Sequence, residues 1–277
     1  MQLIESYPTP QAMALATEDE VLMKWQGAGY YNRARRLHAL AKQLAGGALP
    51  MTAKELQRLP GIGPYTAAAV ASIAYDEPIA CVDGNIRRII SRLHSWPEPT
   101  TQQIQIAADN LLDKKHPGDW NQAMMDLGAL ICTPKNPECG KCPLFPQCSG
   151  KSSPHKFPKP KKRRQQDEYG VALVIRSGTE IFLERRPPGL LGGLWCPPIR
   201  LGTNSCKSIL DEFGLSGHVT LDAGKVMHIF SHRKWHLDVH FLTLSSPFIH
   251  PSGRWDNPSE KSATRLTERL ITLLPPT

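Results

Sequence analysis

Four cysteines that fall within seventeen residues limit how the middle of this chain can fold. They are Cys132, Cys139, Cys142 and Cys148, and their spacing is C-x6-C-x2-C-x5-C. We expect a cytosolic chain because the N-terminus shows no apolar leader segment, and in such a chain this cluster indicates a metal site rather than disulfides. Four thiolates suit either one tetrahedral zinc ion or a [4Fe–4S] cluster, and the spacing alone leaves both open.

The composition is typical of a soluble globular protein. The 277 residues are 40% hydrophobic and 21% charged, and the length is sufficient for two domains with separate cores. No apolar run approaches the roughly 20 residues that a membrane helix needs, so we expect no membrane association. The formal net charge of +8 indicates an anionic partner.

Most of the excess positive charge lies in one short stretch. Residues 1–150 carry 14 basic and 14 acidic side chains, whereas residues 151–166 carry seven basic and no acidic side chains. The seven are Lys151, Lys156, Lys159, Lys161, Lys162, Arg163 and Arg164. Three prolines in the same stretch predict an extended, solvated linker between two domains. The charges serve either as a soluble spacer or as contacts to nucleic-acid phosphates.

Residues 1–150 carry the signals of an all-α domain. Thr17 and Thr52 are each followed three residues later by a glutamate, a pattern typical of the capping box at a helix start. Residues 30–45 form a helix candidate that ends at a glycine pair. Residues 120–131 have apolar side chains at helical spacing, which predicts another helix.

Residues 167–277 predict an α+β domain. Two apolar runs, 171–175 and 181–183, are separated by a Ser-Gly turn and indicate a β-hairpin. Residues 235–244 alternate between apolar and polar side chains as a strand does, and residues 264–274 form a terminal helix candidate. The expected fold is therefore an all-α domain, a basic linker and an α+β domain.

A glycine-containing turn, Leu59-Pro60-Gly61-Ile62-Gly63, precedes a helix of small residues. Two glycines permit a tight turn whose backbone N–H groups face outward at a helix start, where an anion is favoured. Gly61, Ile62 and Gly63 are therefore candidates for holding a DNA phosphate without reading its sequence. An ordinary turn between two helices would explain the same residues.

Asp83 follows an apolar run and stands at an expected helix start. One interpretation is an N-cap aspartate, which is a structural role. The other is a carboxylate in a cleft that stabilises a cationic transition state. The residue's position in the sequence suits both.

Four motifs in a fixed order make the chain similar to a known family. The order L-P-G-I-G-P-Y-T, V-D-G-N, W-N-Q-A-M-M-D-L-G and then the cysteine spacing resembles the helix-hairpin-helix DNA glycosylases with an iron–sulfur loop. Within that family the resemblance is greatest to the adenine DNA glycosylases of the MutY type. It implies that the four cysteines carry a [4Fe–4S] cluster, in an all-α helix-hairpin-helix domain over residues 1–150.

The resemblance implies base-excision repair: hydrolysis of adenine from 8-oxoguanine:adenine or guanine:adenine mispairs in double-stranded DNA, by a bacterial cytoplasmic monomer associated with the nucleoid. Asp83 would stabilise the developing oxocarbenium ion, with Tyr65 beside it and Asn85 orienting the site. Tyr65 stands where the related endonuclease III has a nucleophilic lysine, which favours a monofunctional enzyme. Further DNA contacts are expected from Tyr30, Arg88 and Lys135.

The C-terminal part, residues 167–277, resembles the Nudix fold. Phe230, Ser231 and His232 are similar to the F-S-H turn with which this family recognises 8-oxoguanine, although a strand end with a capping serine would explain them as well. Nudix hydrolases carry several glutamates on one helix to bind Mg²⁺ and a diphosphate, but here only one acidic pair, Asp211-Glu212, is present. We expect a lesion-binding module without hydrolase activity.

One family feature is absent. The general-acid glutamate and a Q-Q-T-Q segment of the family lie upstream of the point where the similarity to this chain begins. We expect an N-terminally truncated gene model, and little or no adenine excision if these 277 residues are the whole protein. The alternatives are an endonuclease III-like glycosylase/lyase and a non-catalytic remnant that binds lesion DNA.

Overall fold

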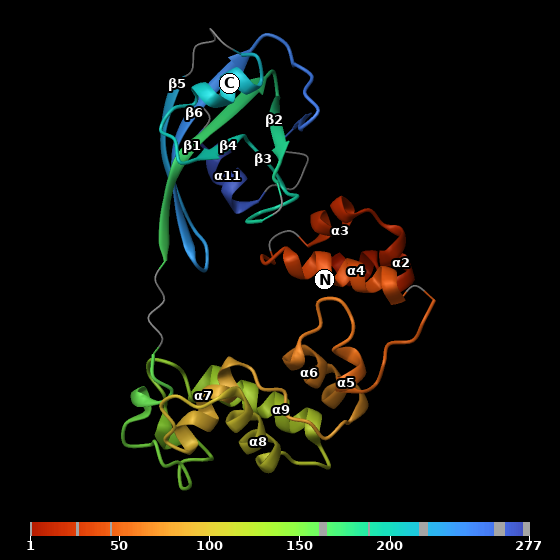
Figure 1. The fold of residues 1–277 in the computed structure, drawn as a ribbon, viewed down its shortest axis with the longest axis vertical. Helices are drawn as coiled ribbons and strands as arrows, with labels where there is room; N and C mark the ends of the chain where they lie inside the picture. Colours follow the sequence, from red (N-terminus) through yellow and green to blue (C-terminus); the bar gives the residue numbers. More distant parts are fainter. Residues whose placement is uncertain are drawn as a thin grey trace. The chain divides into compact units, whose positions relative to one another are not determined.

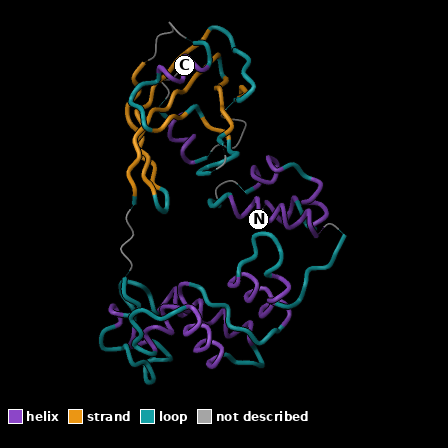
Figure 2. Tube along the Cα trace, in the orientation of Figure 1, coloured by secondary structure: helices purple, strands orange, loops and turns teal. Residues whose placement is uncertain are grey.

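Up to residue 160 the described secondary structure is entirely helical, and every described strand comes after it (Figures 1 and 2). This is a computed structural model, and it describes residues 2–25, 28–44, 46–160, 165–187, 189–215, 221–257 and 264–273. None of the helices in these ranges is long and apolar enough to span a bilayer. The expected order of an all-α part and then a part containing strands is confirmed.

The chain forms two compact units, each described here by itself. The helical unit comprises residues 7–16 and 35–162, and the sheet unit comprises residues 1–6, 17–34 and 163–277. The domain boundaries expected at residues 150 and 166 stay a prediction.

The helices follow the sequence signals closely. They are α1 (Gln2–Ser6), α2 (Pro10–Leu15), α3 (Glu18–Lys24), α4 (Asn32–Leu44), α5 (Ala53–Leu56), α6 (Pro64–Tyr75), α7 (Gly84–Leu93), α8 (Thr101–Leu111) and α9 (Pro117–Asp126), followed by a π-helical turn η1 (Leu127–Ile131) and the 3₁₀ turns η2 (Cys139–Lys141) and η3 (Pro154–Lys156). The capping box at Thr17 is complete, and Thr52 accepts a hydrogen bond from the Glu55 N–H. The helix expected over 120–131 ends as a π-helical turn from Leu127.

The core of the helical unit holds α7 in place. Ile86, Ile89 and Ile90 on α7 are buried in one apolar cluster with Ile104 of α8 and Met124 of α9. These are the i, i+3 and i+4 positions of one helix face. The buried apolar face of α7 therefore fixes the position of the helix and of the residues at its N-terminus.

Helix α6 lies against α9 because small residues allow a close approach. A Cβ at Gly118 of α9 would lie 2.9 Å from the carbonyl oxygen of Ser72, so only glycine fits without a shift of the backbone. This contact sets the position of the α6 residue Tyr65 relative to Met125 on α9, whose side chains share a hydrogen bond.

Residues 151–160 differ from the extended linker predicted there. Pro154–Lys156 forms a 3₁₀ turn, and the carbonyls of Pro154 and Phe157 accept hydrogen bonds from Arg92 on α7. The N–H of Lys159 bonds to the carbonyl of Pro97, 2.8 Å away. A buried arginine without a nearby carboxylate needs carbonyl acceptors, and this segment supplies two. Residues 161–164 of the expected linker lie outside the described residues.

The sheet unit contains a mixed sheet. Its described strands are β1 (Gln166–Ser177), β2 (Glu180–Arg185), β3 (Trp195–Cys196), β4 (Ile199–Leu201), β5 (Leu221–Ile229), β6 (Arg233–Leu244) and β7 (Gly253–Asp256). The order is β3-β2-β1-β6-β5, with β4 paired to β1 and β7 to β2. The long strands β1 and β6 run parallel side by side, and the other pairs are antiparallel (Figure 1). The β1–β2 hairpin and the β6 strand were expected from the sequence.

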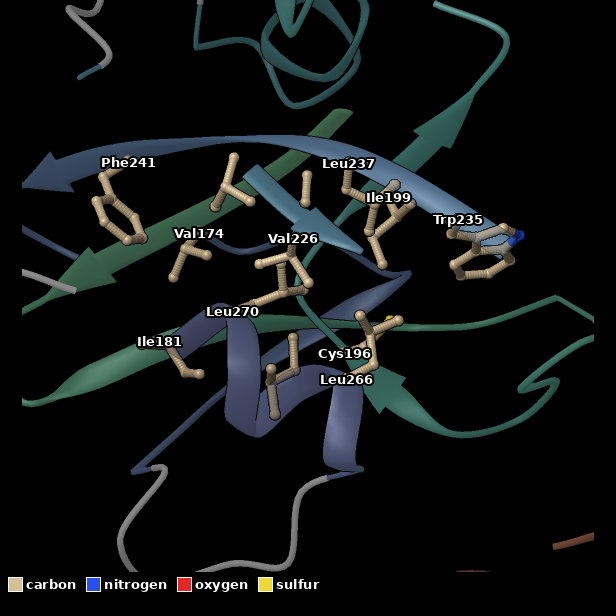
Figure 3. Close-up of a cluster of buried hydrophobic side chains, with 13 residues drawn as sticks. Val174, Ile181, Cys196, Ile199, Val226, Trp235, Leu237, Phe241, Leu266 and Leu270 are labelled. Atoms are coloured by element: carbon tan, nitrogen blue, oxygen red, sulfur yellow. The ribbon is translucent and has the colours of Figure 1, made fainter. Parts of the chain in front are cut away.

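In the described part of the chain, α11 packs on one face of this sheet and α10 on the other. Because side chains alternate along a strand, Ala172 and Val174 face the terminal helix α11 (Arg265–Ile271), whose Leu266 and Leu270 fill the cluster in Figure 3. On the other face, apolar residues of β1 and β6 pack against α10 (Lys207–Glu212) through Ile209.

Candidate functional site

Asp83 caps helix α7. Its Oδ1 accepts a hydrogen bond of 2.6 Å from the N–H of Ile86, and its side chain is half-buried. The structural interpretation of Asp83 is thus confirmed. The functional interpretation, a carboxylate that faces a reacting group, stays a prediction.

Tyr65, on α6, lies within electrostatic range of Asp83. Its hydroxyl donates to the Met125 sulfur at 3.4 Å, and its side chain is 41% exposed. Partial burial, with smaller contributions from Cys81 and Asp83, raises the pKa of Tyr65. Burial and then Asp83 raise the pKa of Cys81 to about 11. Near neutral pH both Tyr65 and Cys81 are therefore uncharged, next to a carboxylate that accepts hydrogen bonds.

Asn85 is held by Arg88. Arg88 Nη2 donates to Asn85 Oδ1 at 2.9 Å and to the carbonyl of Gly128 at 2.6 Å, and Nε donates to the carbonyl of Cys132 at 2.7 Å. The expected DNA contact of Arg88 stays a prediction, but these bonds give it a role that the sequence analysis did not include. They connect the helix start near Asp83 to the first cysteine of the cluster.

Gly128 is required where the π-helical turn passes α7. A Cβ at this position would lie 2.5 Å from the Cβ of Asn85. A π-helical turn inside a helix often marks a functional position. Here it turns the Gly128 carbonyl toward Arg88 and leads the chain to Cys132.

The four predicted cysteines line one cavity. The other lining residues are mostly apolar: Ile89, Leu93, Ile131, Pro137, Leu144, Phe145 and Pro154, with Arg92 and Lys151. Burial raises the pKa of the Cys142 and Cys148 thiols. Within the described ranges, no group of three or more His, Cys, Asp or Glu side chains is close enough together to hold a single metal ion.

Arg92 ties this loop together and was missed by the sequence analysis. It is 3% exposed, and its guanidinium donates to the Cys132 sulfur at 3.2 Å and to the carbonyl of Thr133 at 2.8 Å. Its other acceptors are the carbonyls of Cys132, Pro134, Pro154 and Phe157. The sequence did hold one signal for this role: Arg92 lies on the apolar face of the 84–93 helix. An arginine is rarely buried there unless its charge has hydrogen-bond partners.

The predicted hairpin has the geometry of an anion site. Gly61 has φ +78°, which L-residues disfavour, and Gly63 caps α6 without a side-chain hydrogen bond. The first N–H groups of α6 are thus left for an external acceptor. Ile62 is half-buried, and Lys135 is exposed in the loop between Cys132 and Cys139. Their DNA contacts stay predictions.

Tyr30 meets the predicted F-S-H turn within the sheet unit. Its hydroxyl lies 3.4 Å from Ser231 Oγ, although the two residues are 201 positions apart. Tyr30 is 73% exposed, has φ +47°, and its ring lies against the Arg33 guanidinium. Two candidates chosen separately from the sequence therefore lie side by side.

The turn that carries Phe230 is anchored from strand β1. The Gln166 N–H donates to the carbonyl of His232 at 3.0 Å, and the Phe230 ring packs edge-on against Trp235 at 4.9 Å. Trp235 is buried, and its Nε1 donates to Glu168 at 2.8 Å. These contacts attach the turn to the buried part of the sheet.

Glu212, one of the acidic pair on α10, is bound by an arginine. Glu212 accepts hydrogen bonds from Arg200 at 2.7 and 3.2 Å, and Arg200 also holds the buried Glu184. Glu212 is therefore engaged in an ion-pair network that supports β4.

Comparison with known proteins agrees with both parts of the chain. Residues 1–114 match the family described as HhH-GPD superfamily base excision DNA repair protein, and residues 170–270 match the NUDIX domain. An adenine DNA glycosylase of Rattus norvegicus is 33% identical, over 91% of this chain and 62% of the relative. The adenine DNA glycosylase of Homo sapiens is 32% identical, over 91% of this chain and 59% of the relative.

One bacterial relative is matched over more of its length than the rat and human proteins are. The adenine DNA glycosylase of Buchnera aphidicola subsp. Schizaphis graminum is 32% identical, over 87% of this chain and 72% of the relative. A solved structure of a thermostable thymine-DNA glycosylase superposes with a TM-score of 0.51 and 30% identity, over 54% of this chain and 72% of that chain. The chain spans about three fifths of the length of the rat and human relatives.

Replacing Arg92 should destabilise the helical unit strongly. Arg92→Ala leaves buried carbonyls without a donor, and we expect a loss of at least about 1–3 kcal/mol. Arg92→Lys keeps the charge but cannot form the same fork of hydrogen bonds, so its loss should be intermediate. Urea unfolding followed by circular dichroism at 222 nm measures both. The exposed control Arg58→Ala should change stability by less than about 0.5 kcal/mol, and an equally mild Arg92→Ala would contradict the role of Arg92.

Proposed function

The chain belongs to the adenine DNA glycosylase family, and on that basis we propose that it removes adenine from 8-oxoguanine:adenine and guanine:adenine mispairs in double-stranded DNA. The observation that carries the proposal is the arrangement of Asp83, Tyr65 and Asn85 around the starts of α6 and α7. Tyr65 follows Gly63 of the hairpin by two residues, and the charge of Asp83 contributes to the raised pKa of Tyr65.

Asp83 stabilises positive charge in this reaction. Adenine leaves the helical stack and enters the site, which costs a few kcal/mol and less at a mispair. As the N-glycosidic bond breaks, the sugar becomes an oxocarbenium ion, and a fixed carboxylate at this point lowers its free energy. Arg88 positions Asn85 beside that carboxylate. No residue of this chain is assigned to protonate the leaving adenine.

The chemistry at Tyr65 favours hydrolysis over a lyase reaction. A lyase forms a Schiff base with an amine, and the side chain that reaches this place is a phenol kept neutral by burial. Water is therefore the nucleophile. Strand cleavage without added base would contradict this assignment.

DNA is held by two surfaces in this proposal. In the helical unit the Gly61–Gly63 backbone binds a phosphate and Lys135 adds a charge. In the sheet unit Tyr30 and the Phe230–His232 turn contact 8-oxoguanine. A hydroxyl and an imidazole suit that base because its N7 has become a donor, and an aromatic ring stacks on it.

A [4Fe–4S] cluster is the cofactor that the cysteine cavity fits. The four thiols line one mostly apolar cavity, and four cysteine thiolates are the ligand set of such a cluster, in which each cysteine binds a different iron. When bound, the cluster would cross-link Cys132, Cys139, Cys142 and Cys148 and stabilise the loop that carries Lys135.

Replacing Asp83 with asparagine tests the chemistry separately from folding. Asparagine is an equally good N-cap, so Asp83→Asn should leave stability and DNA binding unchanged. Release of adenine from an 8-oxoguanine:adenine duplex under single turnover by the full-length protein should fall at least about 100-fold. The exposed Asp119→Asn is the matched control and should release adenine normally. Retained turnover in Asp83→Asn would reject the role of Asp83.

Replacing Phe230 tests the specificity for the oxidised base. Phe230→Ala should weaken binding to an 8-oxoguanine:adenine duplex by about tenfold through loss of one stacked ring, and should leave binding to an undamaged duplex unchanged. Fluorescence anisotropy measures both affinities. The exposed control Ile249→Ala should alter neither. Equal losses on both duplexes would show that Phe230 supports general DNA binding only.

Iron and sulfide analysis tests the cofactor. The purified protein should be brown and contain about four iron and four acid-labile sulfide per chain. Cys139→Ser should lower both. One zinc per chain and no sulfide would overturn the assignment.

A further inference from the structure

We propose that a cavity on the α10 face of the sheet binds a nucleobase. The cavity has a volume of ≈ 340 Å³, and the residues that carry the argument are Tyr169, Asn204, Lys225, Met227, His236 and Asp238. It belongs to residues that the proposed base excision does not use. The proposal therefore stands independently of glycosylase activity.

The cavity exists because α10 covers only part of this sheet face. Tyr169 on β1 is in register with His236 on β6, which is in register with Met227 on β5. Partners in register point to the same side, so these three side chains form a row across the sheet. Farther along β1, Leu173 and Ile175 of the same face pack against α10. Beyond α10, Tyr169 and Met227 of this row are exposed among the residues that the structure describes.

A stacked aromatic pair, Tyr169 and His236, lines the cavity. The rings of Tyr169 and His236 stack with centroids 4.7 Å apart at 17°. His236 Nε2 lies 2.7 Å from Asp167 Oδ1, which holds the imidazole in this orientation. Tyr169 is 64% exposed and Met227 is 49% exposed, which is unusual for large side chains on a sheet. A flat aromatic ligand can extend this stack.

The rim provides hydrogen-bonding groups for the edge of such a ligand. Thr203 and Asn204, in the loop after β4, lie on one side, and the ion pair of Lys225 and Asp238 lies on another. An asparagine amide both donates and accepts, which matches the edge of a base. A second cavity of ≈ 840 Å³ shares Tyr169, Thr203 and Asn204 with the first. The Tyr169 ring thus borders both hollows.

The charges favour a base over a phosphate group. Lys225 and Asp238 lie 3.1 Å apart and cancel one another. The nearby Glu168 carboxylate pairs with Arg233. Since Glu212 is bound to Arg200, the carboxylates that would hold Mg²⁺ and a diphosphate are not assembled on α10. Recognition would therefore rest on stacking and edge contacts.

The nucleobase could come from either of two sources, a nucleic-acid strand or a free nucleoside or nucleotide. Met227 and His236 lie on the strands that flank the Phe230–His232 turn, so a base of a strand held at that turn is within reach along the same hairpin. A free nucleoside or nucleotide is the other source. The proposal names the base, and the probes below separate the sources.

The test compares Tyr169 variants in the whole chain. Adenosine, guanosine, cytidine and thymidine are titrated by saturation-transfer NMR and calorimetry, and a single-stranded hexanucleotide by fluorescence anisotropy. At least one nucleoside should bind saturably to the unmodified protein. Tyr169→Ala should weaken it by about tenfold, whereas Tyr169→Phe, which keeps the ring, should bind as the unmodified protein does.

The outcomes are distinct. Tighter binding of the hexanucleotide than of any nucleoside, lost in Tyr169→Ala, assigns the cavity to a base within a strand. Equal or tighter binding of a nucleoside assigns it to a free nucleotide. No saturable binding, or binding unchanged in Tyr169→Ala, overturns the proposal. Thermal unfolding confirms that each variant is folded, and adenine release should stay unchanged in Tyr169→Ala.

Discussion

The hydrogen bonds of the buried Arg92 guanidinium join parts of the helical unit that are distant in sequence. Arg92 binds carbonyls before the cysteine loop closes, at Cys132 to Pro134, and after it ends, at Pro154 and Phe157. The same helix carries Arg88, which reaches Asn85 and Cys132. Burying the Arg92 cation costs free energy unless such acceptors surround it. The path of the cysteine loop and the position of α7 therefore depend on each other.

This coupling has a consequence for the proposed reaction centre. Asp83 and Asn85 lie at the N-terminus of α7, whereas the cysteine cavity lies near its C-terminus. A rigid helix connects them, and its apolar stripe is fully buried. A structural change in the cysteine loop would therefore shift the Asp83 carboxylate through Arg88 and through the helix, without any direct contact between the loop and Asp83.

Short-range patterns predicted much of the site. Helix starts at Thr17, Thr52 and Asp83 depend on residues within one turn, and cysteine spacing likewise reflects local chain geometry. Patterns of this kind failed for residues 151–160, where proline and charge indicated an extended chain. The carbonyls of Pro154 and Phe157 accept hydrogen bonds from Arg92, and these bonds hold the segment against the helical unit. The bonded residues are more than 60 positions apart, so a local sequence pattern cannot predict them.

The amino-acid order alone established the two classes of secondary structure, the four-cysteine loop and the positions of Asp83 and the glycine hairpin. Only the tertiary structure determined which residues that are distant in the sequence contact each other. Tyr30 reaches Ser231, Arg88 reaches Cys132, and Tyr169 stacks on His236, across 201, 44 and 67 positions respectively. The reason is physical: hydrogen bonds and stacking act over a few ångströms, and only packing brings distant residues within that range.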